Sequence, residues 1–505
     1  MESGAATGLS AVRNQLRLAT NWHWPNIDAF LAIVVGFATL ACYAALDEGR
    51  LEALAVLSLL APVPLLVYSV RVSRDLLDLG VLLAGALFLY FGIRPLVVLT
   101  GGDPLLNPLV DTASNGSKAD GLVMGIAGCL AAWVGYMAVR EGLRGLRQRR
   151  GGDVLTPSIS GRIAAALLII GLPALVLQAA ASQAGLDGRE SDLGSTSGLL
   201  NVAAVVPFYG FALLGLLLPS GNRRVHVAWA LSLVLLLSVG VVSLFKETIV
   251  LTVLCAIVPL HYLVRPIRFR EGLALILAFT LVVVPAVGAL REARSGDASK
   301  IGALGELPAR LMTHDLRTGK LDDTPATAAP WRYVLQATNL TSRRLSGTDS
   351  VIAVTRRTPV PLEYERGHTL VPLAAGPVPR FLWPSKPKTG LGRWFTERYW
   401  APGTKNTSAQ PITVVGEGYV NFGFVGVIGL LVILAGVWAA LAVVLNPSAG
   451  GLVLLAYPFV VAAALAVERN LAYTMVNLGQ RVAPLVLLWP AIVLLERRRA
   501  STACA

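Results

Sequence analysis

Long apolar runs separated by short polar segments dominate this chain of 505 residues. A membrane-spanning helix needs about 20 predominantly apolar residues. Hydrophobic residues make up 55% of the chain and charged residues only 14%, a composition that excludes an ordinary soluble domain. We therefore expect an all-α polytopic membrane protein with about 12 transmembrane helices. The expected spans are residues 28–46, 51–70, 76–99, 121–139, 161–183, 197–218, 225–245, 248–264, 271–290, 420–445, 451–467 and 482–496.

The apolar run from Val225 to Val264 is too long for a single span, and two charged residues, Lys246 and Glu247, interrupt it near its centre. One long tilted helix would have to carry both charges through its middle. We expect two helices joined by a tight polar hairpin instead.

Lys and Arg are distributed unequally between the two sets of short loops. The set that includes both termini carries 18 of these residues, whereas the other set carries six. Cytoplasmic loops are enriched in Lys and Arg, so we expect both termini in the cytoplasm. Part of the net charge of +13 therefore reflects topology and does not indicate binding to nucleic acid.

The four cysteines lie in expected spans or near the C-terminus, and none lies between residues 291 and 410. No disulfide framework or metal site is predicted from them. The first apolar run lacks a convincing small-residue cleavage site, so we expect it to be retained as a helix.

One long polar segment divides the chain into three parts. Residues 1–290 hold the expected transmembrane helices 1–9, residues 291–410 form a large extracytoplasmic loop, and residues 411–505 hold helices 10–12 and a basic cytoplasmic tail. The loop contains four tryptophans, whereas disordered segments are poor in aromatic residues. We expect a folded cap with short helices, including an amphipathic stretch from Ser350 to Arg357 that could lie on the bilayer surface.

The long loop is basic although no topological rule requires positive charge on its side of the membrane. It holds 18 Lys or Arg residues against 10 Asp or Glu residues. The planar guanidinium of Arg matches a phosphate through two parallel hydrogen bonds. The loop is therefore expected to bind an anionic ligand; the alternative is contact with anionic lipid head groups.

Four cations near the membrane boundary are candidates for such binding. Arg291 and Arg294 follow the ninth span at i and i+3, so a continuing helix would present both on one face, toward a lipid diphosphate or as interfacial anchors. Arg94 stands inside an apolar run, where ionisable residues are functional candidates. Lys246 lies either at an exposed hairpin tip or, with Glu247, in a charged pair at a cavity.

Two segments with distinctive sequences flank the end of the loop. The first is Pro379-Arg380-Phe381-Leu382-Trp383-Pro384-Ser385-Lys386-Pro387, and the second is Glu417-Gly418-Tyr419-Val420-Asn421-Phe422-Gly423. Together they resemble the O-antigen polymerase family, the Wzy-type polymerases of lipid-linked oligosaccharide repeat units. The resemblance extends to Gly92-Ile93-Arg94-Pro95, to the hairpin at Lys246 and to Arg469, and it covers the chain from about residue 76 onward. One departure is Phe-Lys-Glu at the hairpin, where related ligases more usually have Ser-Arg.

The resemblance implies a reaction and a compartment. A growing glycan would be transferred from polyprenyl diphosphate to a hydroxyl of an incoming lipid-linked repeat unit, at the outer face of the bacterial cytoplasmic membrane. It also implies a GT-C-like architecture. Nucleotide-sugar enzymes generally hold a divalent metal with an Asp-x-Asp pair, and the chain contains no such pair. The expected mechanism is metal-independent and needs no cofactor.

The leaving group of this reaction is a lipid diphosphate, whose developing charge preorganised arginines could stabilise. Arg291 and Arg380 are the candidate catalytic cations. The acceptor hydroxyl also needs a proton acceptor, for which Glu417 and His368 are candidates; a structural His368 and a Glu417 that orients an Arg are the alternatives. The candidate substrate-binding residues are Arg94, Lys246, Arg294, Trp383, Lys386, Asn421, Arg469 and Arg481. Trp383, Trp394 and Trp400 suit either sugar stacking or interfacial anchoring.

Two other functions fit part of this pattern. A ligase would move finished glycan from the same lipid to another acceptor, and a flippase or exporter would move lipid-linked oligosaccharide across the bilayer. Exporters usually spread charge along a transport path, whereas this chain concentrates charge at one face, which favours catalysis. The expected partners are the lipid-linked oligosaccharide, membrane lipid, and flippase and chain-length regulator proteins.

Overall fold

The computed structural model describes residues 50–95, 113–143, 157–183, 200, 203–243, 246–286, 334, 337–338, 341–342, 345–376, 383, 386–387, 389–403, 409–449 and 451–503. Every regular element in these ranges is a helix, as expected for the all-α class. The expected span 28–46 and three of the candidate arginines, Arg291, Arg294 and Arg380, lie outside the described residues.

Seven helices are long and apolar enough to cross a membrane, and each coincides with an expected span: Leu51–Ser73, Asn115–Gly142, Gly161–Ala180, Arg223–Val241, Glu247–Val264, Phe269–Ala286 and Val414–Val444. Three further expected spans correspond to shorter apolar helices, Leu79–Pro95, Val206–Ser220 and Gly451–Leu465. The last expected span lies within the helix Leu471–Ala503. The described chain is therefore that of a membrane protein with several spans, fewer of them full-length than the sequence predicts.

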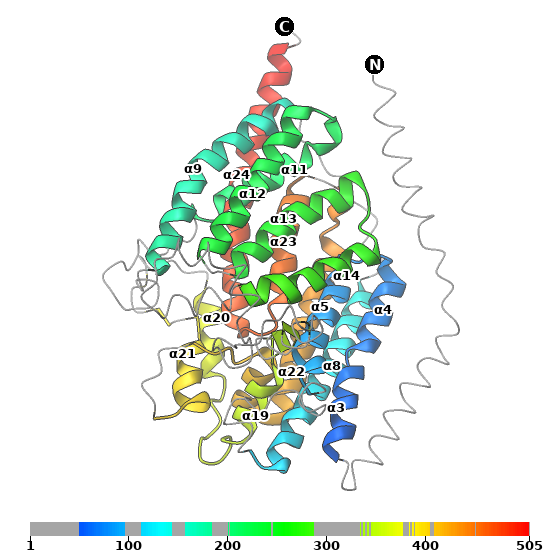
Figure 1. The fold of residues 1–505 in the computed structure, drawn as a ribbon, viewed down its shortest axis with the longest axis vertical. Coiled ribbons are helices and arrows are strands. Elements are labelled where there is room, and N and C mark those ends of the chain that lie inside the picture. The colour runs from blue at the N-terminus through cyan, green and yellow to red at the C-terminus, as the bar shows by residue number, and fades with distance from the viewer. Residues whose placement is uncertain are drawn as a thin grey trace, which may run out of the picture.

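Figure 1 shows the helices that the structure describes, in chain order from blue to red. They are α3 (Arg50–Leu60), α4 (Val63–Ser73), α5 (Leu79–Leu87), α8 (Asn115–Gly142), α9 (Pro157–Gln183), α11 (Val206–Leu216), α12 (Arg223–Ser243), α13 (Lys246–Pro259), α14 (Phe269–Ala278), α19 (Thr348–Thr355), α20 (Val371–Ala375), α21 (Gly392–Phe395), α22 (Val414–Val444), α23 (Gly451–Leu465) and α24 (Leu471–Ala503). Short π or 3-10 segments extend several of them: η1 (Phe88–Gly92), η3 (Leu218–Ser220), η4 (Leu260–Val264), η5 (Phe279–Val283), η7 (His368–Leu370), η8 (Thr396–Trp400) and η9 (Pro447–Ala449).

Side-chain caps fix where several helices begin. The Asp78 side chain accepts the Gly80 N–H at the start of α5, and the Ser114 side chain accepts the Ser117 N–H at the start of α8. Such caps satisfy backbone donors that have no partner within the helix. The α8 cap explains why this helix starts before the apolar run on which the span 121–139 was based.

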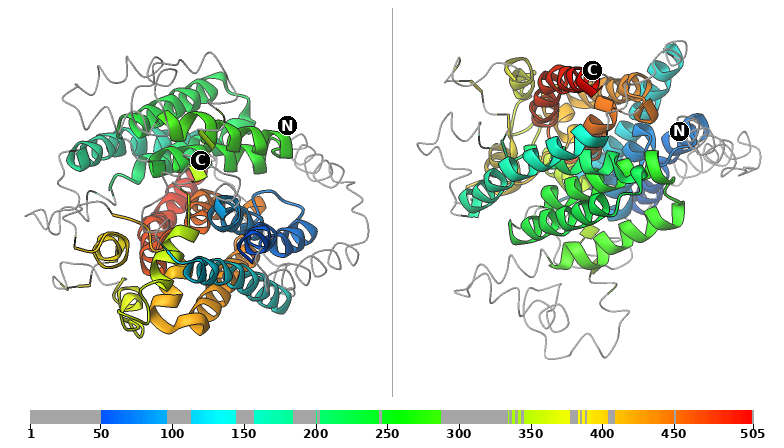
Figure 2. Two further views of the ribbon diagram at one scale, coloured as in Figure 1. Left: turned by 60° about the horizontal axis from the view of Figure 1, so that its bottom comes forward. Right: turned by 90° about the horizontal axis from the view of Figure 1, so that it is seen from above.

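The helices pack around two apolar cores. Figure 2 shows the helices of residues 203–286, drawn in green, on one side of the molecule and α3, α5, α8 and α22 on the other. The larger core joins α5, α8, α22 and α23, and the second joins α9, α11, α13 and α23. α23 contributes to both cores, so it connects the two groups of helices.

The interface between α8 and α22 depends on glycine. At Gly135 a Cβ atom would lie 2.4 Å from the carbonyl oxygen of Val432, and at Gly436 it would lie 3.0 Å from the Val139 side chain. Only a residue without a side chain allows the α8 backbone to approach so closely at Gly135. These contacts hold α8 and α22 side by side over much of their length.

The expected hairpin between residues 225 and 264 is confirmed. α12 ends at Ser243 and α13 begins at Lys246, and a Cβ at Gly240 would lie 2.8 Å from the Ile249 side chain. In one continuous helix these residues would be about 13 Å apart. The chain therefore reverses between them, and the single tilted helix is excluded.

The described part of the long loop contains the short helices α19, α20 and α21. The expectation that the segment from Ser350 to Arg357 lies on the bilayer surface is wrong. Residues Thr348 to Val354 of α19 are buried, because this helix packs between α8 and α22. A Cβ at Gly121 of α8 would lie 2.4 Å from the Ile352 side chain, so small residues on α8 make room for α19.

Candidate functional site

The helix α22 is a helical hairpin and not one continuous rod. Its dihedral angles leave the helical region at Phe422 and Gly423, and a Cβ at Gly418 would lie 2.7 Å from the carbonyl oxygen of Gly426. Residues eight apart in a continuous helix are separated by about 12 Å. A first limb, residues 414–421, therefore runs to a tip at Phe422–Gly423, and a second limb, residues 424–444, runs back beside it.

Three glycines make this hairpin possible. Gly423 has a φ of 64°, a left-handed conformation that glycine adopts readily. Gly418 and Gly426 lie where the two limbs touch, and each is so close to the backbone of the other that no Cβ atom fits. The expected continuous span 420–445 thus has an internal reversal, whose signal in the sequence is the glycine spacing at positions 418, 423 and 426.

The long loop covers the tip of the hairpin. The Glu365 N–H donates to the Val420 carbonyl at 2.9 Å, and the Gly367 N–H donates to Asn421 Oδ1 at 2.8 Å. Asn421 Nδ2 donates to Thr369 Oγ1 at 2.6 Å. The first bond satisfies the Val420 carbonyl, which lies at the end of the first limb and would otherwise lack a partner. The structure thus gives Asn421, a candidate substrate ligand, the role of a clamp between hairpin and loop.

Glu417 lies inside the hairpin and is fully buried. Its Oε2 atom accepts the Leu471 N–H, the first residue of α24, at 2.6 Å. Oε1 accepts no hydrogen bond of regular geometry from the described residues, although the Thr369 hydroxyl lies near enough to act on the carboxylate. Glu417 therefore ties the first limb to the start of α24, and no described Arg pairs with it.

Two arginines from the end of the chain converge on one carboxylate. Arg469 Nη2 lies 2.8 Å from Glu247 Oε2, and Arg481 Nη2 is bonded to Glu247 Oε1. Arg469 precedes α24, Arg481 lies within it, and Glu247 is in the first turn of α13. The side chains of Arg469 and Arg481 keep 24% and 20% of their surface exposed, so a ligand could still reach them.

The electrostatics of this cluster leave hydrogen-bond donors available. A guanidinium carries five N–H donors, and the hydrogen bonds to Glu247 come from one nitrogen of each arginine, Nη2. Arg469 also stacks on the Tyr473 ring at 4.9 Å. Burial opposes the charge of Arg469, but Glu247 outweighs it and raises the pKa of that guanidinium. Glu468 is a second carboxylate whose charge acts on Arg469, so Arg469 lies between two acidic residues.

Loop residues lie against the same part of α24. Asn470 Nδ2 donates to the Thr389 carbonyl at 2.8 Å, and the buried Lys386 donates from Nζ to the Gly376 carbonyl at 2.7 Å. A Cβ at Gly376 would lie 2.2 Å from the side chain of Val476. The segment that contains Lys386 is thus packed on α24 within two turns of Arg469.

Arg94 is a second buried cation near the loop. It is almost fully buried, with Nε 3.5 Å from Asp349 Oδ2 and Nη1 3.3 Å from Ser342 Oγ. The Gly347 N–H donates to the Tyr90 carbonyl at 2.8 Å, which connects the start of α19 to η1, the extension of α5. The contacts of Arg94 therefore attach the loop to the helices.

The structure brings some of the candidate residues together and separates others. Arg469 and Arg481 share Glu247, while Glu417 and Asn421 belong to the adjoining hairpin. His368 and Trp383 are exposed. Lys246 begins α13 beside Glu247, and its side chain is outside the described set. Glu247, which joins the two arginines, was considered only as a partner of Lys246 and was not among the candidate ligands.

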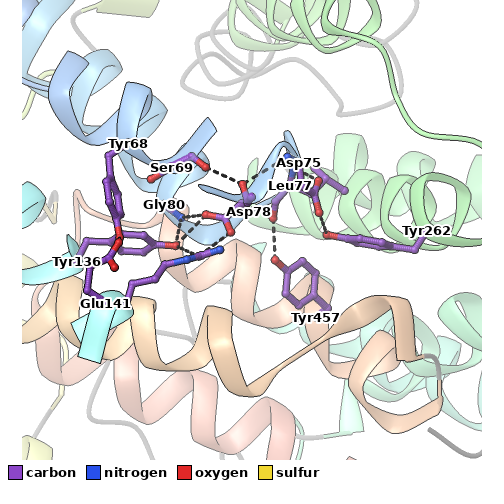
Figure 3. Close-up of polar contacts among 12 residues, drawn as sticks. Tyr68, Ser69, Asp75, Leu77, Asp78, Gly80, Tyr136, Glu141, Tyr262 and Tyr457 are labelled. Atoms are coloured by element: carbon purple, nitrogen blue, oxygen red, sulfur yellow. Dashed lines mark hydrogen bonds and ion pairs between the residues drawn. The ribbon is translucent and has the colours of Figure 1, made fainter. Parts of the chain in front are cut away.

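A second polar cluster lies at the opposite end of α8, and the sequence analysis missed it (Figure 3). Asp78 accepts hydrogen bonds from Tyr136 Oη at 2.8 Å and from the Gly80 N–H at 2.9 Å, and its Oδ2 lies 2.8 Å from Arg140 Nη1. Ser117 contacts Thr355 of the loop, and Arg140 is 23 residues further along α8, about 35 Å away. Asp75, close to this cluster in the chain, is bonded to Tyr262, 15 residues beyond Glu247 along α13 and η4, so the cluster lies about 20 Å from Glu247.

The same end contains a second carboxylate contact, at the half-buried Asp75. Asp75 Oδ1 lies 3.0 Å from His261 Nε2, and Tyr262 Oη donates to Asp75 Oδ2 at 2.6 Å. His261 Nδ1 accepts the Ile267 N–H at 3.0 Å, so the proton of a neutral ring lies on Nε2. Burial opposes ionisation of Asp75, but the bonds and charge of His261 and the bond from Tyr262 outweigh it and lower the pKa of the carboxyl. These contacts hold the α4–α5 turn on η4, the π-helical extension of α13.

A family model described as a domain of unknown function (DUF8712) matches residues 208–455. This range contains Glu247 and the hairpin of α22, but it ends before Arg469 and Arg481. No curated protein and no solved structure matches this chain.

Proposed function

We propose that this protein polymerises polyprenyl-diphosphate-linked oligosaccharide repeat units into a cell-surface polysaccharide. The reaction takes place at the outer face of a bacterial cytoplasmic membrane, with both termini in the cytoplasm. The Wzy-like segments around Trp383 and Glu417 support this proposal, as does the surplus of positive charge in the long loop. The enzyme is a metal-independent glycosyltransferase with about 12 spans and a GT-C-like architecture.

The convergence of Arg469 and Arg481 on Glu247 is the observation that carries the proposal. A carboxylate between two guanidinium groups fixes both in position before any ligand arrives. Preorganised cations that need no rearrangement are the groups that stabilise a developing negative charge most effectively. The departing diphosphate develops that charge, and the free N–H groups of both arginines are its expected donors.

The hairpin and loop contribute position, and His368 contributes proton transfer. Glu417 fixes the start of α24, two residues after Arg469, and thereby the direction from which Arg469 approaches Glu247. Glu417 is fully buried and accepts a hydrogen bond from a backbone N–H. We therefore assign it the role of positioning Arg469 and not that of a proton acceptor. His368 is exposed on the loop next to the Asn421 clamp. It is the proposed acceptor of the hydroxyl proton from the incoming repeat unit.

The test is reconstitution with a defined substrate. Purified protein in liposomes receives a polyprenyl-diphosphate-linked repeat unit in the presence of a metal chelator, and the products are separated by gel electrophoresis. A ladder of elongated glycans is the expected result. Movement of intact substrate across the bilayer without elongation contradicts the proposal and identifies a flippase. Transfer to an added second acceptor without elongation also contradicts it and identifies a ligase.

A further inference from the structure

Apolar side chains are exposed at the tip of the α22 hairpin. Phe422 is 51% exposed, Phe424 49% and Val425 76%. The loop segment on the tip adds Val360, which is 77% exposed. Tyr419 Oη lies 3.5 Å from the Thr358 carbonyl, and a Cβ at Gly423 would lie 3.0 Å from the Tyr364 hydroxyl, so this segment is held on the hairpin. We call these four residues the tip surface.

The tip surface continues an apolar stripe on the second limb of the hairpin. Ile433, Val437 and Val444 are exposed on α22 below Val425. Positions 425, 429, 433 and 437 are four residues apart, so they share one face of the helix. Because α22 belongs to the helices that are apolar enough to cross a membrane, this stripe faces lipid. The tip surface is the next turn of the same face.

The depth of the tip follows from the length of the second limb. Residues 424–444 rise by about 1.5 Å each, which gives about 30 Å, the thickness of the hydrocarbon core. Phe424 and Val425 then lie at the edge of the hydrocarbon, and Phe422 and Val360 at the level of the head groups. The Val420 and Asn421 carbonyls are bonded to loop N–H groups, which satisfies the backbone at this depth.

A cation lies beside the tip surface. Arg366 is exposed and has a φ of 49°, and its N–H donates to the Asn421 carbonyl at 3.2 Å. The contact with Asn421 holds this strained backbone in place. The Cα atom of Arg366, from which the guanidinium extends, is therefore fixed next to the tip. Nearby Arg398, in contrast, is paired with Glu365 at 2.9 Å. Arg366 is thus suited to a lipid phosphate at the head-group level.

We infer that the tip surface and Arg366 form a binding site for an anionic phospholipid of the surrounding leaflet, with its acyl chains along Phe424 and Val425 and its phosphate on Arg366. The site accepts the lipid laterally from the bilayer. It does not depend on the proposed glycan reaction, because it rests only on the exposed stripe of α22 and the loop that covers its tip.

The test uses a fluorescent label on the full-length protein in nanodiscs, without any glycan substrate. Cys42 and Cys504 are replaced by Ser, and bimane is attached at Val360→Cys. Matched labels are placed at Ile433→Cys, in the stripe, and at Arg393→Cys, a charged position that is 59% exposed on α21. Spin-labelled phosphatidylglycerol or phosphatidylcholine with a shallow nitroxide serves as the quencher, and iodide serves as the aqueous quencher.

The expected result is that spin-labelled phosphatidylglycerol quenches the Val360 label at least about twofold more than the Arg393 label, and more than phosphatidylcholine does. Arg366→Gln, whose backbone N–H is retained, should abolish the preference for phosphatidylglycerol. Equal lipid quenching at positions 360 and 393 overturns the site. Shielding of position 360 from both lipid and iodide also overturns it, because the tip would then be covered by protein. An unchanged preference in Arg366→Gln overturns the role of Arg366.

Discussion

Glu417 Oε2 accepts the backbone N–H of Leu471 at 2.6 Å, which joins a buried limb of the α22 hairpin to the first residue of α24. The same junction is strengthened by the Thr413 N–H, which donates to the Glu468 carbonyl at 2.9 Å. Arg469 lies between these two contacts. The geometry of the hairpin therefore determines where Arg469 meets Glu247.

Replacing Glu417 separates a positioning role from a proton-transfer role. Glu417→Gln keeps an oxygen that can accept the Leu471 N–H, so we expect stability and elongation rate close to those of the wild type. Glu417→Ala leaves this buried N–H without a partner and should lower stability by about 1–3 kcal/mol. Thermal unfolding in detergent and the elongation rate are the measurements. A Gln variant that folds normally but has no activity would identify Glu417 as the base.

The hairpin depends on the close approach of its two limbs. Gly418→Ala places a Cβ 2.7 Å from the Gly426 carbonyl oxygen, and because backbone lies on both sides we expect a loss of about 1–3 kcal/mol or more. Gly429→Ala is the matched control in the same helix, since no atom lies within 4 Å of its Cβ position. The control should be neutral or stabilising by up to about 1 kcal/mol. Equal melting temperatures for both variants would contradict the hairpin.

The buried pair of Asp78 and Arg140 gives a prediction for the other end of the molecule. Asp78→Ala leaves the Arg140 charge buried without its carboxylate and should cost about 3–5 kcal/mol. The double variant Asp78→Leu, Arg140→Met removes both charges and should recover most of that loss. Arg265→Ala, which breaks an exposed pair with Glu271, should cost less than about 1 kcal/mol. No recovery in the double variant would show that the pair has a role beyond mutual neutralisation.

Asp75 predicts how stability depends on pH. The pKa of its carboxyl is lowered in the folded protein, whereas an unfolded Asp has a pKa of about 3.9. The stabilisation is therefore complete above about pH 4 and is lost as the pH falls through the lower folded value. The difference in melting temperature between the wild type and Asp75→Asn should shrink from about pH 5 to about pH 3. If the difference in melting temperature grows as the pH falls from about 5 to about 3, the pKa of Asp75 is not lowered in the folded protein and the prediction is wrong.

The sequence predicted the helices correctly where a run of apolar residues was long and uninterrupted. The hairpin at Lys246 was located correctly because two adjacent charges interrupt an apolar run. The reversal at Gly423 was missed, since Phe422, Phe424 and Val425 continue the apolar run without a polar break. Composition alone does not distinguish a helix that turns back from one that continues.

The candidate site could be predicted only in part, for a physical reason. Arg469 was selected because it belongs to the family resemblance, and Arg481 was a candidate substrate ligand with no predicted partner. Their shared partner, Glu247, lies more than 200 positions away along the chain, and no local pattern links the three residues. Asp75, Asp78 and Arg140 were missed for the same reason, because their pairing follows from the packing of α5, α8 and α13.

The central claim is that Arg469 and Arg481 stabilise the departing lipid diphosphate. The most direct measurement is the initial rate of glycan elongation for Arg469→Ala and Arg481→Ala, with Arg469→Lys and Arg481→Lys as variants that keep the charge without the planar fork. Arg393→Ala, exposed at the loop end, is the control. We predict a loss of about 100-fold for each Ala variant at an unchanged fold, an intermediate loss for each Lys variant, and no loss for the control. Elongation rates within about twofold of the wild type in all four variants would contradict the account.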